Sequence, residues 1–147
     1  MPHFVDTLPP GECIFCRLIA GEIPASRIYE DADTLAFLDL GQLNPGHSLV
    51  AVKRHAETLL DLTPDEAAAA MRTAHRVAQA QQRAFGAPGL TLLQCNGKEG
   101  WQSVGHFHIH IVPRQADDGV GLIWPRKEPP REVLEATAAQ LRAVLAE

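Results

Sequence analysis

The sequence has no apolar run close to the ~20 residues that a membrane-spanning helix requires. It also has no excess of basic residues, since 13 Lys and Arg stand against 18 Asp and Glu and give a formal net charge of −5. A broad nucleic-acid surface needs a positive field, so this balance argues against nucleic acid as a partner and leaves open only a local phosphate site. We therefore expect neither a membrane protein nor a nucleic-acid-binding protein.

Cysteine is scarce, because only Cys13, Cys16 and Cys95 are present. Residues 1–11 contain three prolines and lack the basic and apolar regions of a secretory signal peptide. A cytoplasmic location is the expectation that follows, and thiols there stay reduced. We accordingly expect no disulfide framework, and we interpret Cys95, at the end of an apolar stretch, as a small buried residue.

The chain length of 147 residues is enough for one domain with a hydrophobic core, and 46% apolar with 21% charged residues is ordinary for a globular protein. Residues 1–10 read as a flexible arm. No internal repeat or linker divides the remainder, so residues 11–147 are expected to form a single domain.

The spacing of apolar and turn residues predicts three helices and five strands. The helices are expected over 13–21, over 63–85 and from Pro130 onward, and the strands over 26–29, 34–40, 47–52, 90–95 and 105–113. Thr63, Pro64 and Glu66 form a capping-box start for the long second helix, and Gly86 suits its end. Consecutive strands with short links favour a five-stranded antiparallel sheet with the helices packed on it, an α+β fold.

The stretch 105–113 alternates histidine with large apolar residues, which is typical of a strand whose neighbouring side chains point to opposite faces. His106, His108 and His110 should therefore share one face, with about 6.6 Å between neighbours. A surface strand whose polar face happens to be histidine is the unremarkable interpretation. A metal site, a nucleophilic site, or both divided among the three imidazoles are the functional ones.

Two chemistries fit these residue types. Cys13 and Cys16 offer two soft ligands on one helical turn, and a structural zinc site needs four Cys or His ligands, for which His55 and His106 are candidates. The alternative is a pair of ordinary thiols. A neutral imidazole is also a good nucleophile at pH 7 because its ordinary pKa lies near 6.5, and His108 has an imidazole on each side.

These features together resemble the histidine triad (HIT) superfamily. Residues 106–112 match its His-φ-His-φ-His-φ-φ motif, in which φ is apolar. Further landmarks are the segments 13–16, 21–24, 35–39, 46–47, 49–50 and 102–104, together with His55. The resemblance covers nearly the whole chain and points to the Hint-type branch, especially its bacterial members with a zinc site.

The resemblance implies nucleotidyl hydrolysis or transfer, in which His108 attacks the α-phosphorus and forms a nucleotidyl-histidine that water then cleaves. His110 would contact the phosphate and assist the leaving group, and His47 would line the phosphate site. The remaining implied positions are Asn96, Gln102 and Ser103 for phosphate or leaving group, Ile14, Phe15, Leu18, Phe37 and Leu49 for base and sugar, and Asp39 for ribose. For Leu18 and Phe37, ordinary core placement is an equal alternative.

The same resemblance implies a structural zinc ion held by Cys13, Cys16, His55 and His106, a purine nucleotide conjugate as substrate, and a homodimer formed through the long helix and the central strands. Trp124 would belong to a segment that reaches the partner's site. One departure is Trp101, which stands where the family usually has glycine and puts the leaving-group preference in question. A nucleotide-binding regulatory protein with little catalysis and a zinc hydrolase that uses all three triad histidines as ligands remain as other hypotheses.

Overall fold

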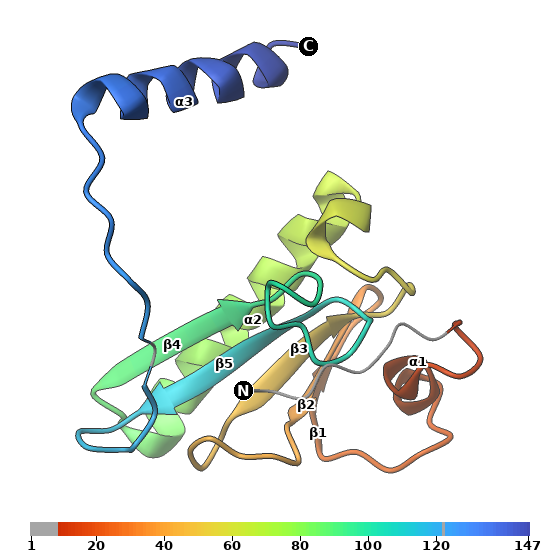
Figure 1. The fold of residues 1–147 in the computed structure, drawn as a ribbon. Coiled ribbons are helices and arrows are strands. Elements are labelled where there is room, and N and C mark those ends of the chain that lie inside the picture. The colour runs from red at the N-terminus through yellow and green to blue at the C-terminus, as the bar shows by residue number, and fades with distance from the viewer. Residues whose placement is uncertain (1–8, 122) are drawn as a thin grey trace.

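A computed structural model describes residues 9–121 and 123–147 (Figure 1). The helices are α1 (Ile14–Ile19), α2 (Pro64–Phe85) and α3 (Arg131–Leu145), and the strands are β1 (Arg27–Glu30), β2 (Thr34–Leu38), β3 (Ser48–Val52), β4 (Gly89–Gln94) and β5 (His108–Arg114). All eight expected elements are present, each within a few residues of its expected bounds. Among the described residues, none of the helices has the length and apolar character needed to cross a membrane.

The five strands form one antiparallel sheet in the order β1-β2-β3-β5-β4, which confirms the predicted α+β fold. In the centre of the sheet, β3 pairs with β5 so that Ser48 lies opposite Ile111 and Leu49 lies opposite His110. This register places the residues that follow Pro45 beside the histidine strand.

Two apolar clusters cover the two faces of the sheet. The cluster beneath α2 consists of Ala36, Val50, Val52, Ala70, Ala74, Val77, Phe107, Ile109 and Ile111. The cluster beneath α1 consists of Cys13, Phe15, Leu18, Leu35, Phe37, Leu49 and Ala51. Neighbouring residues of β2 and β3 fall in opposite clusters, as strand geometry requires. The predicted separation on the histidine strand is confirmed, since its apolar residues face α2.

The long helix α2 begins and ends where the sequence predicted. The Thr63 hydroxyl accepts a hydrogen bond from the Glu66 amide, the Glu66 carboxylate accepts one from the Thr63 amide, and Pro64 occupies the first helical position. Gly86 closes the helix with φ +59° in the left-handed region. These local signals fix the ends of α2, and its small apolar residues let it lie close to β2, β3 and β5.

The histidine strand differs from the prediction in two respects. β5 begins at His108, so His106 precedes it, and the Phe107 amide donates to the Ala56 carbonyl instead of a strand partner. The strand was also expected to be half-buried, whereas both faces are covered because α1 lies over the histidine side. His106 and His108 are buried, with exposed fractions of 0% and 3%.

The C-terminal helix forms as predicted, but its expected packing on the sheet is wrong. Figure 1 shows α3 held away from the sheet at the end of an extended arm. No residue of α3 is buried, and its apolar stripe is exposed at Val133, Leu134, Leu141, Val144 and Leu145. Pro125, Pro129 and Pro130 keep the preceding arm extended, because each fixes φ and disfavours a helical residue before it. The arm predicted over residues 1–10 falls almost entirely outside the described residues.

Candidate active site

A cavity of about 180 Å³ opens between α1, the end of β2 and the histidine face of the sheet. Of the residues predicted to contact nucleotide or to act in catalysis, those lining it are Ile14, Phe15, Leu18, Phe37, Asp39, Leu49, Ser103, His108 and His110. Leu18 and Phe37 satisfy both interpretations, since they are buried in the cluster beneath α1 and also line the cavity. The predicted cleft is therefore one continuous site with an apolar wall and an imidazole wall.

The tautomer of His108 follows from its hydrogen bond. Its Nδ1 lies 2.7 Å from the carbonyl oxygen of His106, and a carbonyl only accepts, so Nδ1 carries the proton. The lone pair is left on Nε2. The edge-to-face ring of Phe15, 5.1 Å away between centroids, holds the imidazole in place. Burial lowers the pKa of His108 below its ordinary value, so the ring is neutral at pH 7 with a free nucleophilic nitrogen.

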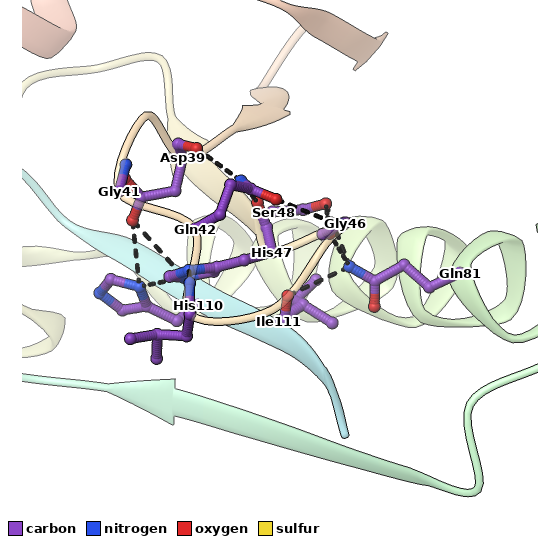
Figure 2. A network of polar contacts seen from close by, with 10 residues as sticks. Asp39, Gly41, Gln42, Gly46, His47, Ser48, Gln81, His110 and Ile111 are labelled. Carbon is purple, nitrogen blue, oxygen red and sulfur yellow. Dashed lines mark hydrogen bonds and ion pairs between the residues drawn. The ribbon is translucent and has the colours of Figure 1, made fainter. Parts of the chain in front are cut away.

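A second chain of hydrogen bonds fixes His47 and His110. The Leu43 amide donates to Nδ1 of His47, 3.2 Å away, so His47 carries its proton on Nε2. That nitrogen lies 2.9 Å from Nδ1 of His110, which must accept, and the proton of His110 is consequently on Nε2 (Figure 2). Burial, aided by His108 and His47, lowers the pKa of His110 to about 3. His110 thus offers an N–H donor where His108 offers a lone pair.

Asp39 adds a carboxylate beside this pair. Its Oδ2 lies 3.5 Å from Nε2 of His47 and 3.8 Å from Nδ1 of His110, and its Oδ1 accepts from the Gly41 amide. The three side chains could be taken for a cation site because their ligand atoms lie within 4.8 Å of one another. The Leu43 hydrogen bond argues against that, since it keeps the proton on the His47 nitrogen that a cation would need.

The loop before the histidine strand is held by Gln102. Its Oε1 accepts from the Gly97 amide, and its Nε2 donates to the carbonyls of Glu57 and Val104, which occupies the whole amide. Asn96 is similarly engaged, accepting from the Leu59 amide and donating to Gln94. Neither lines the cavity, whereas Ser103 does. The structure therefore assigns Gln102 and Asn96 loop-building contacts, and their predicted phosphate contacts stay predictions.

Trp101 adopts an unusual backbone conformation in the same loop. Its φ is +68°, in the left-handed region that favours glycine, and its side chain is 46% exposed. A Cβ on the preceding Gly100 would lie 2.2 Å from the Asn96 carbonyl oxygen, so the turn is tight. The Trp101 indole stands two residues before Ser103, which lines the cavity.

The four predicted metal ligands converge at the other end of the histidine row. Nδ1 of His106 lies 3.5 Å from both Cys13 Sγ and Cys16 Sγ, and Nδ1 of His55 lies 3.2 Å from Cys16 Sγ. Edges of about 3.5 Å are expected for a tetrahedron of sulfur and nitrogen around zinc. Nε2 of His106 donates to the Val52 carbonyl at 2.6 Å, which leaves the Nδ1 lone pair facing the thiols.

The electrostatics of this cluster also fit a cation. Burial, with Cys13 beside it, raises the pKa of the Cys16 thiol to about 12, and burial lowers the pKa of His106 to about 4. Both shifts mean that burial disfavours an isolated thiolate and an isolated imidazolium. Two thiolates together with a divalent cation would compensate each other's charge. His106 faces the thiols while His110 faces His47, so the three triad histidines do not share one metal position, and the zinc-hydrolase hypothesis gains no support.

Sequence reasoning missed several cavity residues. Those that line the site without having been predicted are Ile23, Pro24, Ala25, Ser26, Leu38, Leu40 and Val104. Ile23, Pro24, Leu38 and Val104 belong to the family landmarks 21–24, 35–39 and 102–104, so that signal was available. Ala25, Ser26 and Leu40 lie outside those landmarks, and only the path of the chain brings them to the cavity.

Comparison with known proteins agrees with this geometry. The family model described as HIT domain matches residues 20–117. The chain is 42% identical over 113 residues to the Bacillus subtilis protein named Protein hit, covering 76% of this chain and 78% of that one. It is 36% identical over 114 residues to an adenosine 5'-monophosphoramidase of Schizosaccharomyces pombe, covering 77% and 83%.

Solved structures give the same result. A HIT family protein from Bacillus anthracis superposes with a TM-score of 0.87 at 37% identity, covering 90% of this chain and 96% of that chain. A zinc-bound histidine triad family protein from Mycobacterium smegmatis superposes with a TM-score of 0.73 at 35% identity, covering 92% and 99%. The family model, the relatives and the solved structures agree, and the chain belongs to the HIT domain family.

Proposed function

We propose that this protein hydrolyses a purine nucleotide conjugate, a phosphoramidate or a dinucleoside polyphosphate, at its α-phosphate through a nucleotidyl-histidine formed on His108. The observation that carries the proposal is the pair of tautomers, with a lone pair on His108 Nε2 and an N–H on His110 Nε2 lining the same cavity. The monophosphoramidase named above supports the reaction class.

In the first step His108 Nε2 forms a bond to phosphorus, and the bond from phosphorus to the leaving atom breaks with its electron pair going to that atom. The leaving atom takes one proton. The negative charge of a bound phosphate favours uptake of a second proton by His110 at Nδ1, which then donates to the Asp39 carboxylate, 3.8 Å away, in place of accepting from His47. His110 can then give the Nε2 proton to the leaving atom.

In the second step water attacks the nucleotidyl-histidine, the bond from phosphorus to Nε2 breaks, and the proton released by water returns to His110. The two steps balance, because one proton leaves His110 and one is regained. The apolar wall formed by Phe37 and Leu49 would hold the base and sugar, and the Asp39 carboxylate would accept from ribose hydroxyls.

We also propose that Cys13, Cys16, His55 and His106 hold a structural zinc ion, in line with the zinc-bound relative. When bound, zinc would neutralise the two thiolates and tie α1 to the ends of the central strands, and four protein ligands would leave it no position for substrate. This role requires reduced thiols and so a reducing compartment, which we propose to be the cytoplasm.

A homodimer is the proposed assembly. The edge strand β4 exposes Leu90 and Leu92 at 38% and 39%, and Met71 on the outer face of α2 is 54% exposed. An apolar edge and an apolar helix face of this kind favour pairing with another chain.

The test is AMP release from adenosine 5'-phosphoramidate by the parent, by His108→Ala and by His75→Ala, a control that removes an exposed imidazole from α2. We expect release by the parent and the control only, and a mass increase of one adenylyl group on the parent after quenching in alkaline denaturant, which preserves the bond from phosphorus to imidazole nitrogen. Full activity of His108→Ala would refute the assignment. Tight AMP binding without turnover by the parent would favour a nucleotide-binding regulatory protein.

A further inference from the structure

We propose that Gln81, on the side of the sheet opposite the cavity, is a positioning residue that sets the contact between His47 and His110. The inference rests on the proposed function for its kinetic consequence, but its geometric content stands on the contacts of the Gln81 amide. Gln81 belongs to α2, lies 30 residues before Ile111 and 33 after Ser48 in the chain, and is 4% exposed.

The Gln81 amide joins three backbone or side-chain acceptors. Its Nε2 lies 2.8 Å from the Gly46 carbonyl, 3.0 Å from Ser48 Oγ and 3.1 Å from the Ile111 carbonyl (Figure 2). Two N–H groups are therefore shared among three oxygens. Ser48 and Ile111 are partners in the β3–β5 register, so a single side chain from α2 ties both strands at one point.

That point is directly adjacent to the two imidazoles. His47 precedes Ser48 and His110 precedes Ile111, so strand alternation directs both side chains to the face opposite α2, where His110 lines the cavity and contacts His47. Their contact of 2.9 Å depends on how β3 and β5 approach each other and on the turn 44–46. Gln81 fixes both, since it holds the turn through Gly46 and β5 through Ile111.

A second α2 residue grips the same turn. Gly46 has φ +95°, and a Cβ built there would lie 2.4 Å from Cε2 of Phe85, which is one helical turn after Gln81. The turn is thus held by the Gln81 amide and by the Phe85 ring, both from α2. Gln42 also holds this turn, because its Oε1 accepts from the Gly46 amide and its Nε2 donates to the His47 carbonyl.

The unpaired amide oxygen of Gln81 also indicates a specific role for this side chain. Its Oε1 is buried and has no hydrogen-bond partner among the described residues. A buried carbonyl without a hydrogen-bond partner is unfavourable. A methionine would fill the same space without that cost, so packing alone does not account for an amide, whereas the three donations of Nε2 do.

The proposal predicts a selective kinetic defect. If Gln81 acts through the His47–His110 contact, its loss impairs proton delivery to the leaving atom and leaves attack by His108 unchanged. A phosphoramidate, whose amine must be protonated, should suffer by about tenfold, a fraction of what general acid catalysis supplies. The 4-nitrophenyl ester of AMP has a leaving group that departs as an anion and should lose less than about threefold.

The experiment compares the parent with Gln81→Met, Gln81→Glu and the control Gln82→Met, which changes an exposed residue next to Gln81 on α2. Each variant is assayed on both substrates, and long-range proton–nitrogen spectra report which imidazole nitrogens carry protons. We expect Nε2 protonation of His47 and His110 in the parent and the control, and a mixture of tautomers at His110 in both Gln81 variants. Gln81→Glu keeps the shape of the side chain and secures the test if Gln81→Met does not fold.

Two results would overturn the proposal: equal loss on the two substrates, as a purely structural role gives, or unchanged tautomers in a folded Gln81 variant. Inactivity of the parent on both substrates would refute the proposed function instead. In that case the tautomer spectra alone decide the role of Gln81, so the two failures are distinguishable.

Discussion

The depressed pKa of His110 makes the stability of the fold depend on pH in a way that one substitution can isolate. Burial lowers that pKa from 6.5 to about 3. Below pH 6.5 the unfolded chain binds a proton at this position while the folded chain does not, so the free energy of unfolding falls as pH falls. The effect is absent above pH 7 and ends only near the folded pKa.

The magnitude follows from linkage. One unit below the unfolded pKa, the protonated unfolded state is favoured about tenfold, which is about 1.4 kcal/mol at pH 5.5 relative to pH 7.5. His110→Gln removes this titration. Between pH 7.5 and pH 5.5 the free energy of unfolding of the parent should therefore fall by about 1.4 kcal/mol more than that of the variant. The other buried imidazoles are present in both proteins and contribute equally.

The assay is urea unfolding of parent and His110→Gln at about pH 7.5 and pH 5.5 with equal zinc loading, with His75→Gln as the control. The control removes an exposed imidazole and should behave as the parent. A parent and a His110→Gln variant with equal pH dependence would show that His110 titrates normally in the folded chain, and the assignment of a neutral donor at pH 6 would then fail.

Three further outcomes are expected. Cys16→Ser should remove bound zinc, measured by metal analysis, and lower the melting temperature, whereas Cys95→Ser should retain the metal; retention by Cys16→Ser would contradict the ligand set. Gly46→Ala should cost about 1–3 kcal/mol in urea unfolding, because φ is +95° and the new Cβ meets the Phe85 ring. Thr63→Ala should cost about 1 kcal/mol by loss of the α2 cap, and an unchanged unfolding midpoint would argue against that cap.

The sequence predicted those parts of the site that depend on local pattern. Alternation placed the histidines on one face, the capping box set the start of α2, and the spacing of Cys13 and Cys16 supplied half of the metal ligands. These signals are short in range. His55 and His106 were candidates because a zinc site needs four ligands, the family resemblance implied the complete set, and the convergence of the four donors agrees with it.

The parts that could not be predicted depend on contacts between distant segments. Gln81 reads as one polar residue among several in a long helix, and only the fold shows that it faces inward toward Gly46. The apolar stripe of α3 suggested packing on the sheet, but α3 lies away from the sheet after an extended arm that contains three prolines (Figure 1). Gln102 has the residue type of a phosphate ligand, and only the fold shows that its amide also holds the loop through Gly97, Glu57 and Val104.

The hydrogen bond that orients His108, the proposed nucleophile, uses a main-chain atom. His108 is oriented by the carbonyl of residue 106, and every amino acid supplies that carbonyl. The side chain at position 106 therefore does not orient His108, whereas in a serine hydrolase triad a carboxylate side chain orients the histidine. This division lets His106, which precedes β5, and His108, which begins it, serve different proposed roles. A chain of this fold without the thiols could replace His106 and keep its nucleophile in the same tautomer.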